Sequence, residues 1–259
     1  DGWRIQDNQS KCQVILWMWR ILCLSDIMPR VAFTESYTSI WRGSDCLKLI
    51  DGLSCNKVID LKKGHVTQTA IINKNAKIID FVTIINFGDF LALVGYLPNY
   101  ESMIDFVTPK ILQSDVSISD VTHLNNVIII YDDELEIETG FFKSQDNITY
   151  AKIYDNLTIA VSAKGNSLDI DSTEKEFHEW RVDRVIPWYN YEIRKNVTPY
   201  ASGLNEFVHE SKGCYAGQEI LTRMRTKNRG IKKLIKIEND SIEEKKITTK
   251  GSENSLAIL

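Results

Sequence analysis

The segment Lys212–Glu219 reads KGCYAGQE and contains the cysteine whose neighbours best suggest chemistry. Two glycines flank Cys214, and glycine lets a backbone turn sharply and approach a ligand closely. The spacing predicts a helix over Glu219–Met224, whose first N–H groups would favour an anion or a thiolate nearby. Lys212 and Arg223 would act in the same direction. The segment is therefore either a reactive thiol site or a glycine-rich turn around a small buried cysteine, and spacing alone slightly favours the turn.

Basic residues continue after this segment. They are Lys212, Arg223, Arg225, Lys227, Arg229, Lys232, Lys233 and Lys236, with Glu219 as the single acid among them. Such a run is usually a solvated face. Its functional alternative is an anion site for a polyglutamate tail, a phosphate or RNA, and arginine suits a carboxylate because it makes bidentate contacts.

The overall composition limits these alternatives. The chain has 31 Lys+Arg against 35 Asp+Glu and a net charge of −4, which argues against a nucleic-acid-binding module. No apolar run reaches the about 18 residues that a spanning helix needs, so we expect no membrane partner. Five scattered cysteines without a CxxC pair, and histidines without metal-like spacing, argue against disulfides and a metal site. We expect a reducing compartment, the cytoplasm or a mitochondrial matrix.

Hydrophobic periodicity predicts an α+β fold with largely antiparallel sheets, since regular strand–helix–strand alternation is missing. Expected helices are Ser44–Leu53 (with Ser44 and Asp45 as caps), Tyr100–Leu112 (bent or ended near Pro109) and Asp171–Ile186. Expected strands are Thr67–Ile72, Lys77–Ile85, Phe90–Val94, Val116–Thr122, Val127–Tyr131, Ile148–Tyr154, Leu157–Ser162 and Ile231–Ile237, with two more short ones over 238–259. The first two of these strands form a hairpin around NKNAK.

The first 27 residues differ from the rest, since they hold three of the six tryptophans and an apolar stretch over 12–24. Because a signal peptide needs a basic start and a small-residue cleavage site, that interpretation fails. Residues 1–27 are either an upstream extension before a natural start at Met28 or a buried amphipathic helix. We expect a main domain over 28–230 and a short C-terminal β segment over 231–259.

KGCYAGQE resembles the signature of the YgfZ family, folate-binding proteins linked to iron–sulfur cluster assembly and repair. That family is related to the T-protein of the glycine cleavage system, a tetrahydrofolate-dependent aminomethyltransferase. Weaker similarity runs in order from Ile40 to Lys236. Its pieces are WRGSD at Trp41–Asp45, the hairpin Thr69–Ile84, LQSDVSISDVT at Leu112–Thr122, Arg181–Asp183 and Val197–Pro199 with Leu204 and Asn205.

The resemblance implies the aminomethyltransferase fold, with ferredoxin-like units around a central hole and a C-terminal β-barrel that looks reduced or truncated here. It implies tetrahydrofolate or a one-carbon derivative as cofactor, and iron–sulfur client or assembly proteins as partners. Cys214 and Asp80 become the candidate catalytic residues. The candidate folate- or anion-binding residues are Lys212, Gly213, Tyr215, Gly217, Gln218, Glu219, Arg223 and Arg181.

Three aromatic residues before the signature, Trp188, Tyr189 and Tyr191, either stack on a pterin ring or pack in the core. His209 lies five residues before Cys214. It is either the base of that thiol or, as we expect, a surface histidine.

The chain also departs from the T-protein pattern. The T-protein hairpin carries two adjacent acids, whereas this chain has Asp80 followed by Phe81, and Ala76 in place of a glycine. A single carboxylate still hydrogen-bonds a pterin or assists a proton transfer, or it is simply an exposed or capping residue. We therefore expect an accessory protein for iron–sulfur clusters, with a folate-dependent aminomethyltransferase of the glycine cleavage type as the alternative.

Overall fold

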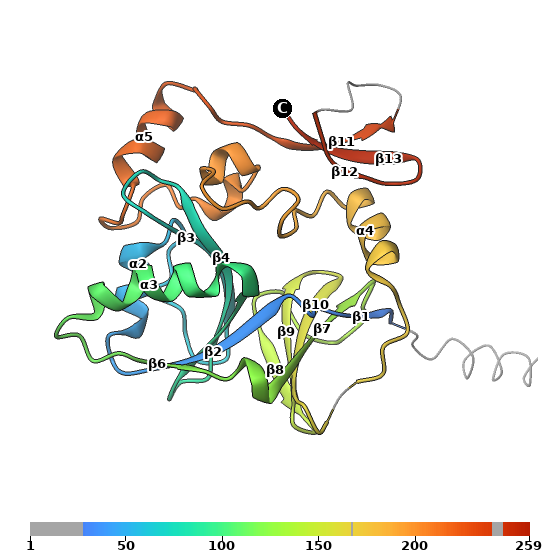
Figure 1. Cartoon of the computed structure of the whole chain (residues 1–259), viewed down its shortest axis with the longest axis horizontal. Helices are drawn as coiled ribbons and strands as arrows, with labels where there is room; N and C mark the ends of the chain where they lie inside the picture. Colours follow the sequence, from blue (N-terminus) through green and yellow to red (C-terminus); the bar gives the residue numbers. More distant parts are fainter. Residues whose placement is uncertain (1–27, 167, 240–245) are drawn as a thin grey trace, which may run out of the picture.

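Two adjacent five-stranded sheets form the centre of the protein (Figure 1). The computed structural model describes residues 28–166, 168–239 and 246–259, so the expected extension over 1–27 lies outside the described residues. The first sheet has the order β3-β4-β5-β2-β6, with β2 (Ser36–Arg42), β3 (Val66–Ile72), β4 (Ile78–Asn86), β5 (Leu91–Tyr96) and β6 (Ser117–Asp120). The second has the order β1-β7-β10-β9-β8, with β1 (Arg30–Ala32), β7 (Asn125–Tyr131), β8 (Phe142–Gln145), β9 (Ile148–Tyr154) and β10 (Leu157–Ala163). Both sheets are antiparallel throughout.

Two helices cover one face of the first sheet. Ile50 of α2 (Cys46–Leu53) and Met103 of α3 (Tyr100–Ile111) are fully buried there, against strand residues such as Leu93. Pro109 lies inside the last turn of α3, which ends two residues later, as expected near a proline. The short 3-10 turns are η1 (Leu97–Asn99), η2 (Thr122–Leu124), η3 (Pro199–Ser202) and η4 (Asn205–Phe207).

The predicted helix is confirmed as α2, but neither Ser44 nor Asp45 caps it through a side-chain hydrogen bond. Asp45 is the N-cap residue but makes no side-chain capping bond. It accepts instead from the backbone N–H of Asp115 at 2.9 Å, and Ser44 donates through its N–H and hydroxyl to the Asp115 carboxylate. A reciprocal contact with the loop before β6 has replaced the local cap.

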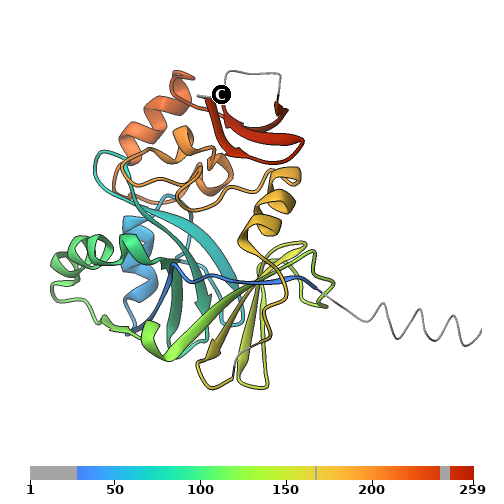
Figure 2. The ribbon, with the colours of Figure 1, turned by 45° about the vertical axis from the view of Figure 1, so that its right-hand side comes forward.

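The predicted helix before Pro187 is confirmed as α4 (Glu174–Asp183), which starts with a capping box between Thr173 and Glu176. An irregular segment over 184–217 follows and leads to α5 (Gln218–Thr226). Figure 2 shows this segment between α4 and α5, beside the β3–β4 hairpin. The segment, the second sheet and the other face of the first sheet share one core, to which Phe81, Ile129 and Leu221 contribute.

The C-terminal strands form a three-stranded antiparallel sheet with the order β11-β13-β12. They are β11 (Leu234–Glu238), β12 (Ile247–Lys250) and β13 (Asn254–Ile258). The sheet packs on α4, which in turn contacts β1. In the described part of the chain these strands make an open three-stranded sheet, and the reduced or truncated barrel stays a prediction. The α+β class with antiparallel sheets is confirmed.

Candidate functional site

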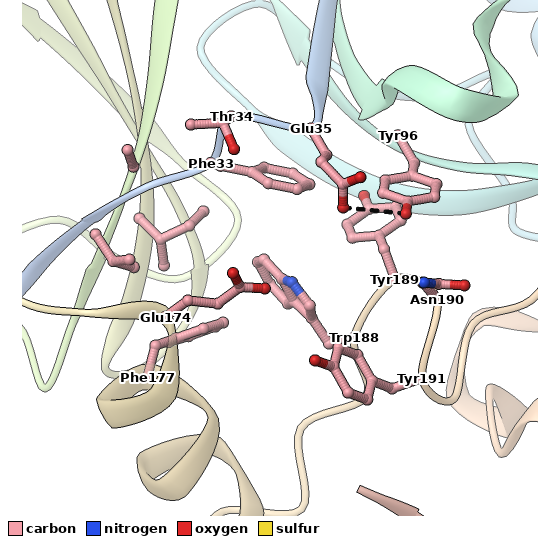
Figure 3. Close-up of a pocket in the computed structure, with 13 residues that line it drawn as sticks. Phe33, Thr34, Glu35, Tyr96, Glu174, Phe177, Trp188, Tyr189, Asn190 and Tyr191 are labelled. Carbon is pink, nitrogen blue, oxygen red and sulfur yellow. Dashed lines mark hydrogen bonds between the residues drawn. The ribbon is translucent and has the colours of Figure 1, made fainter.

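A pocket of about 190 Å³ lies where the link between β1 and β2 crosses from one sheet to the other (Figure 3). Ile129 of β7, the end of β5, the start of α4 and the loop 188–191 complete its wall. Six aromatic side chains line it: Phe33, Tyr96, Phe177, Trp188, Tyr189 and Tyr191. The predicted aromatic group before the KGCYAGQE segment therefore lies at a pocket, while the stacking on a ligand stays a prediction.

Contacts among the rings hold this wall in place. Trp188 meets Phe177 edge-on at 4.6 Å between ring centroids and lies 5.3 Å from Phe33. Tyr189 stacks on Tyr96 at 5.6 Å. Because Trp188 and Tyr189 are both more than nine-tenths buried, they have little freedom to rearrange. The pocket thus offers preformed flat surfaces that suit a planar ring.

Two carboxylates enter the pocket from different elements, Glu35 from the β1–β2 link and Glu174 from the first turn of α4 (Figure 3). Glu35 accepts a hydrogen bond from the Tyr96 hydroxyl at 3.1 Å. Burial and this acceptor raise the pKa of Tyr96 to about 12, so the phenol stays a donor. Glu174 pairs with His178 Nε2 at 3.2 Å. Among the described residues, the lining includes no Lys, Arg or His, so the site favours a ligand edge rich in N–H donors.

No pattern in the sequence singles out Glu35 or Glu174. Glu174 belongs to the first turn of a capped helix, where an acid is expected for the helix alone. Glu35 precedes a strand whose pattern was not recognised. Only the fold brings the two together.

The KGCYAGQE segment lies elsewhere, against the end of α2 and the turn of the β3–β4 hairpin. Lys212 is buried, and its Nζ donates to the backbone carbonyls of Asp51, Ser54 and Asn56 at 2.7, 3.0 and 2.7 Å. It also lies 3.2 Å from the Asp51 carboxylate, and burial lowers the pKa of its ammonium. These partners satisfy the ammonium group of Lys212, which thereby anchors the segment to the end of α2.

Gly217 fixes the other end of the segment. Its φ is +75°, and an added Cβ would lie 2.7 Å from the carbonyl oxygen of Asn73 and 2.8 Å from the backbone of Ala76. Ala76 itself has a left-handed φ of 55° and is fully buried. The N–H of Ala216 also donates to Gly52 at 2.9 Å. By contrast, an added Cβ at Gly213 would meet nothing within 4 Å.

Cys214 is exposed between these two anchors, whereas Cys46 and Cys55 are buried. Of the neighbours predicted with it, Glu219 and Arg223 are exposed and Gln218 is half-buried at the start of α5. The Tyr215 ring lies 4.9 Å from Lys212 Nζ, and burial raises the pKa of its phenol to about 12. His209 Nδ1 accepts from the Ser211 N–H at 3.2 Å, within its own turn.

Asp80 is fully buried, so the exposed alternative is wrong. Its Oδ1 accepts from the Asn99 amide at 2.9 Å, and its other oxygen lies beside the Tyr37 hydroxyl. Burial raises the pKa of Asp80 to about 7. Phe81 points to the opposite face of β4, where its ring lies 5.0 Å from that of Phe207. Phe81 therefore stands where the T-protein pattern has its second acid, and its phenyl ring packs in the shared core.

Arg181 is fully buried behind the pocket wall. It donates to Glu192 at 2.8 Å, to Thr249 Oγ1 at 2.6 Å, to the Ile186 carbonyl at 3.0 Å and to His178 Nδ1 at 2.6 Å. Its guanidinium also lies 4.9 Å from the ring centroid of Tyr191, which lines the pocket. These contacts place Arg181 one layer behind the lining residues.

Among the described residues, no group of three or more His, Cys, Asp or Glu side chains is placed to hold a metal ion. In the same part of the chain, none of the helices combines the length and apolarity needed to cross a membrane.

The fold resembles that of an aminomethyltransferase of known structure. The crystal structure of glycine cleavage system aminomethyltransferase T from Bartonella henselae superposes with a TM-score of 0.73 at 10% identity, covering 89% of this chain and 78% of that one. Aminomethyltransferases from two strains of Leptospira biflexa serovar Patoc are 23% identical over 212 residues, 68% of this chain. The match spans 57% of the length of these relatives. No protein-family model matches the chain. The chain is a distant relative of the glycine cleavage aminomethyltransferases.

Proposed function

We propose that this protein binds tetrahydrofolate or a one-carbon derivative in the aromatic pocket and serves as an accessory factor for iron–sulfur cluster assembly or repair. The observation that carries the proposal is the pocket itself, with six rings and two carboxylates inside an aminomethyltransferase-like fold. The KGCYAGQE segment supports the accessory branch, because it resembles the YgfZ signature. We place this role in the cytoplasm or a mitochondrial matrix.

The residues of the pocket fit one end of a reduced folate. A volume of about 190 Å³ is below the about 300–1,000 Å³ of pockets that enclose a drug-sized ligand, so it takes a ring system and not a whole folate. The pyrimidine edge of a pterin presents N–H donors, which match Glu35 and Glu174. The anionic glutamate tail would point out to solvent, since the lining offers it no cation. When bound, a reduced folate supplies a carrier for one-carbon groups.

Asp80 and Phe81 favour the accessory role over aminomethyl transfer. Asp80 lies on the face of β4 that meets Asn99 and Tyr37, and it has no exposed surface. Phe81 occupies the face toward the shared core. Because a group that moves a proton must reach the reacting atoms, this hairpin lacks an accessible acid for that task.

Cys214 is the proposed reactive centre. It is the exposed thiol among the described cysteines, and its loop is held by Lys212 on one side and Gly217 on the other. A lone thiolate does not hold a cluster, which takes about four. We therefore propose that Cys214 acts transiently on an iron–sulfur client or assembly protein, as ligand, nucleophile or redox thiol.

Calorimetric titration with tetrahydrofolate tests the folate half of the proposal. We expect binding by the wild type and at least about 10-fold weaker binding by Glu174→Gln, because a charged acceptor for the N–H edge of the ligand is lost. Glu101→Gln, an exposed acid on α3, is the matched control and should bind as the wild type. Absence of any folate-dependent heat at millimolar ligand would overturn the proposal.

Complementation tests the thiol half. In a strain that lacks the protein, Cys214→Ala should remain folded and bind folate but fail to support iron–sulfur enzymes. Full complementation by a stable Cys214→Ala protein would leave the segment as a structural turn.

A further inference from the structure

We propose that His178 is a positioning residue of the pocket: as a neutral ring with its proton on Nε2, it holds Glu174 so that this carboxylate meets the N–H edge of a bound heterocycle. The ligand part of this inference rests on the proposed function. The protonation state of His178 does not, because it follows from contacts within the protein.

Arg181 determines which nitrogen of His178 carries the proton. Its Nε–H points at His178 Nδ1 over 2.6 Å. A guanidinium has donors and no acceptor, so Nδ1 must keep its lone pair. The single proton of the neutral ring is then on Nε2, which lies 3.2 Å from Glu174 Oε1. The buried Arg181 thus fixes the direction of both hydrogen bonds: Arg181 donates to His178, and His178 donates to Glu174.

Arg181 cannot easily turn away from His178. The side chain is fully buried, and its two terminal nitrogens donate to Glu192 and the Ile186 carbonyl on one side and to Thr249 on the other. Glu192 also accepts from the hydroxyl of Thr249 at 2.6 Å. Thr249 belongs to β12, so the C-terminal sheet helps to hold Arg181 in place, and Arg181 in turn orients His178.

Titratable side chains from two elements surround the imidazole. On α4 they are Arg181 and Glu174, and from the loop 188–193 Tyr191 and Glu192 face it. The Tyr191 ring lies 4.5 Å from the imidazole. Burial and the Arg181 charge outweigh the two glutamates and lower the pKa of His178. Because the Nε–H of Arg181 points at Nδ1, that nitrogen has no room for a proton, and the neutral ring donates to Glu174 from Nε2.

This arrangement selects a ligand by its donors. Glu174 presents one oxygen to His178, and among the described residues no donor pairs with its other oxygen, Oε2. Glu174 itself lines a pocket of rings that contains a second carboxylate, Glu35. Because 71% of the Glu174 side chain is exposed, its carboxylate would swing between rotamers without the histidine. The substrate class is therefore a flat heterocycle with N–H donors on its edge, and an anionic or purely apolar ring is disfavoured.

Two variants separate positioning from packing. His178→Gln keeps an acceptor for Arg181 and a donor for Glu174, whereas His178→Phe keeps a ring against Tyr191 and loses both hydrogen bonds. In titrations with tetrahydrofolate we expect His178→Gln to bind within about 2-fold of the wild type and His178→Phe to bind about 3- to 10-fold more weakly. In a Glu174→Gln background, His178→Phe should add no further loss. Wild-type affinity of His178→Phe, or equal loss in both variants at equal melting temperature, would overturn the inference.

Nitrogen-15 NMR of the imidazole tests the inference without any ligand. We expect an unprotonated Nδ1 and a protonated Nε2 in the free protein, unchanged between pH 6 and 8. The opposite tautomer, or an imidazolium at pH 7, would overturn the inference. If the wild type binds no tetrahydrofolate, the proposed function fails, while this spectrum still decides the state of His178.

Discussion

Replacing Gly217 by alanine tests whether this glycine is needed for structure. The φ of +75° is a left-handed conformation, which costs a residue with a Cβ about 1–2 kcal/mol. The added Cβ would also lie 2.7 Å from the Asn73 carbonyl oxygen and 2.8 Å from Cα and N of Ala76. These are backbone atoms of a hairpin turn, so relieving the overlap costs about 1–3 kcal/mol more. We expect Gly217→Ala to lower the free energy of unfolding by about 2–5 kcal/mol.

Gly213→Ala is the matched control, four residues earlier in the same segment. Its Cβ would meet nothing within 4 Å, so we expect a change within about 0.5 kcal/mol. Thermal unfolding followed by circular dichroism measures both. At about 2–4 °C per kcal/mol for a domain near this size, Gly217→Ala should melt about 4–20 °C below Gly213→Ala. Equal melting temperatures would refute the assignment of Gly217 to docking on the hairpin.

Three further predictions concern buried and exposed titratable groups. Lys212→Met should lower the free energy of unfolding, measured in urea, by about 3 kcal/mol or more, because three backbone carbonyls lose their donor. Wild-type stability of this variant would contradict the anchoring role of Lys212. The raised pKa of Asp80, about 7, means that the unfolded chain ionises first as pH rises above about 4. Stability should therefore fall between pH 4 and pH 7 by up to about 4 kcal/mol relative to Asp80→Asn, and a pH-independent difference would refute this. Burial raises the pKa of Cys46 and Cys55 to about 11. Iodoacetamide at pH 7 should therefore label exposed Cys214 at least about 10-fold faster than these two, as measured by site-resolved mass spectrometry. Equal labelling rates would contradict the assignment of Cys214 as the accessible thiol.

Elements with a clean period were predictable from the sequence. The β3–β4 hairpin, α4 with its capping box and the short C-terminal strands all follow from local patterns. The strand β2 was missed because its sequence SYTSIWR buries polar residues, among them Ser36, Thr38 and Ser39, so no alternation is visible. The three-residue strand β1 is too short to leave a pattern.

The site was only partly predictable for a different reason. The aromatic group at 188–191 was noticed because rings are conspicuous in a sequence. The ammonium of Lys212 is held by three backbone carbonyls and by the Asp51 carboxylate, and no sequence pattern reports such acceptors. Val185, at a left-handed φ of 58° just after α4, occupies a conformation that β-branched residues rarely adopt. Such features depend on tertiary contacts and leave no local signal.

The short link between β1 and β2 has a consequence for how the protein unfolds. Phe33 donates its N–H to Val127 in the second sheet, and the carbonyl of Glu35 accepts from Leu97 at the end of the first. The pocket wall therefore includes one of the covalent connections between the two sheets. The turn η2 between β6 and β7 is another, and backbone hydrogen bonds such as that from the Val66 N–H to the Gly140 carbonyl also join the sheets. A ligand that contacts this link would be held by both halves, so neither sheet could open without releasing it. Hydrogen exchange should then slow in amides of both sheets on binding, including strands that no ligand in the pocket can touch.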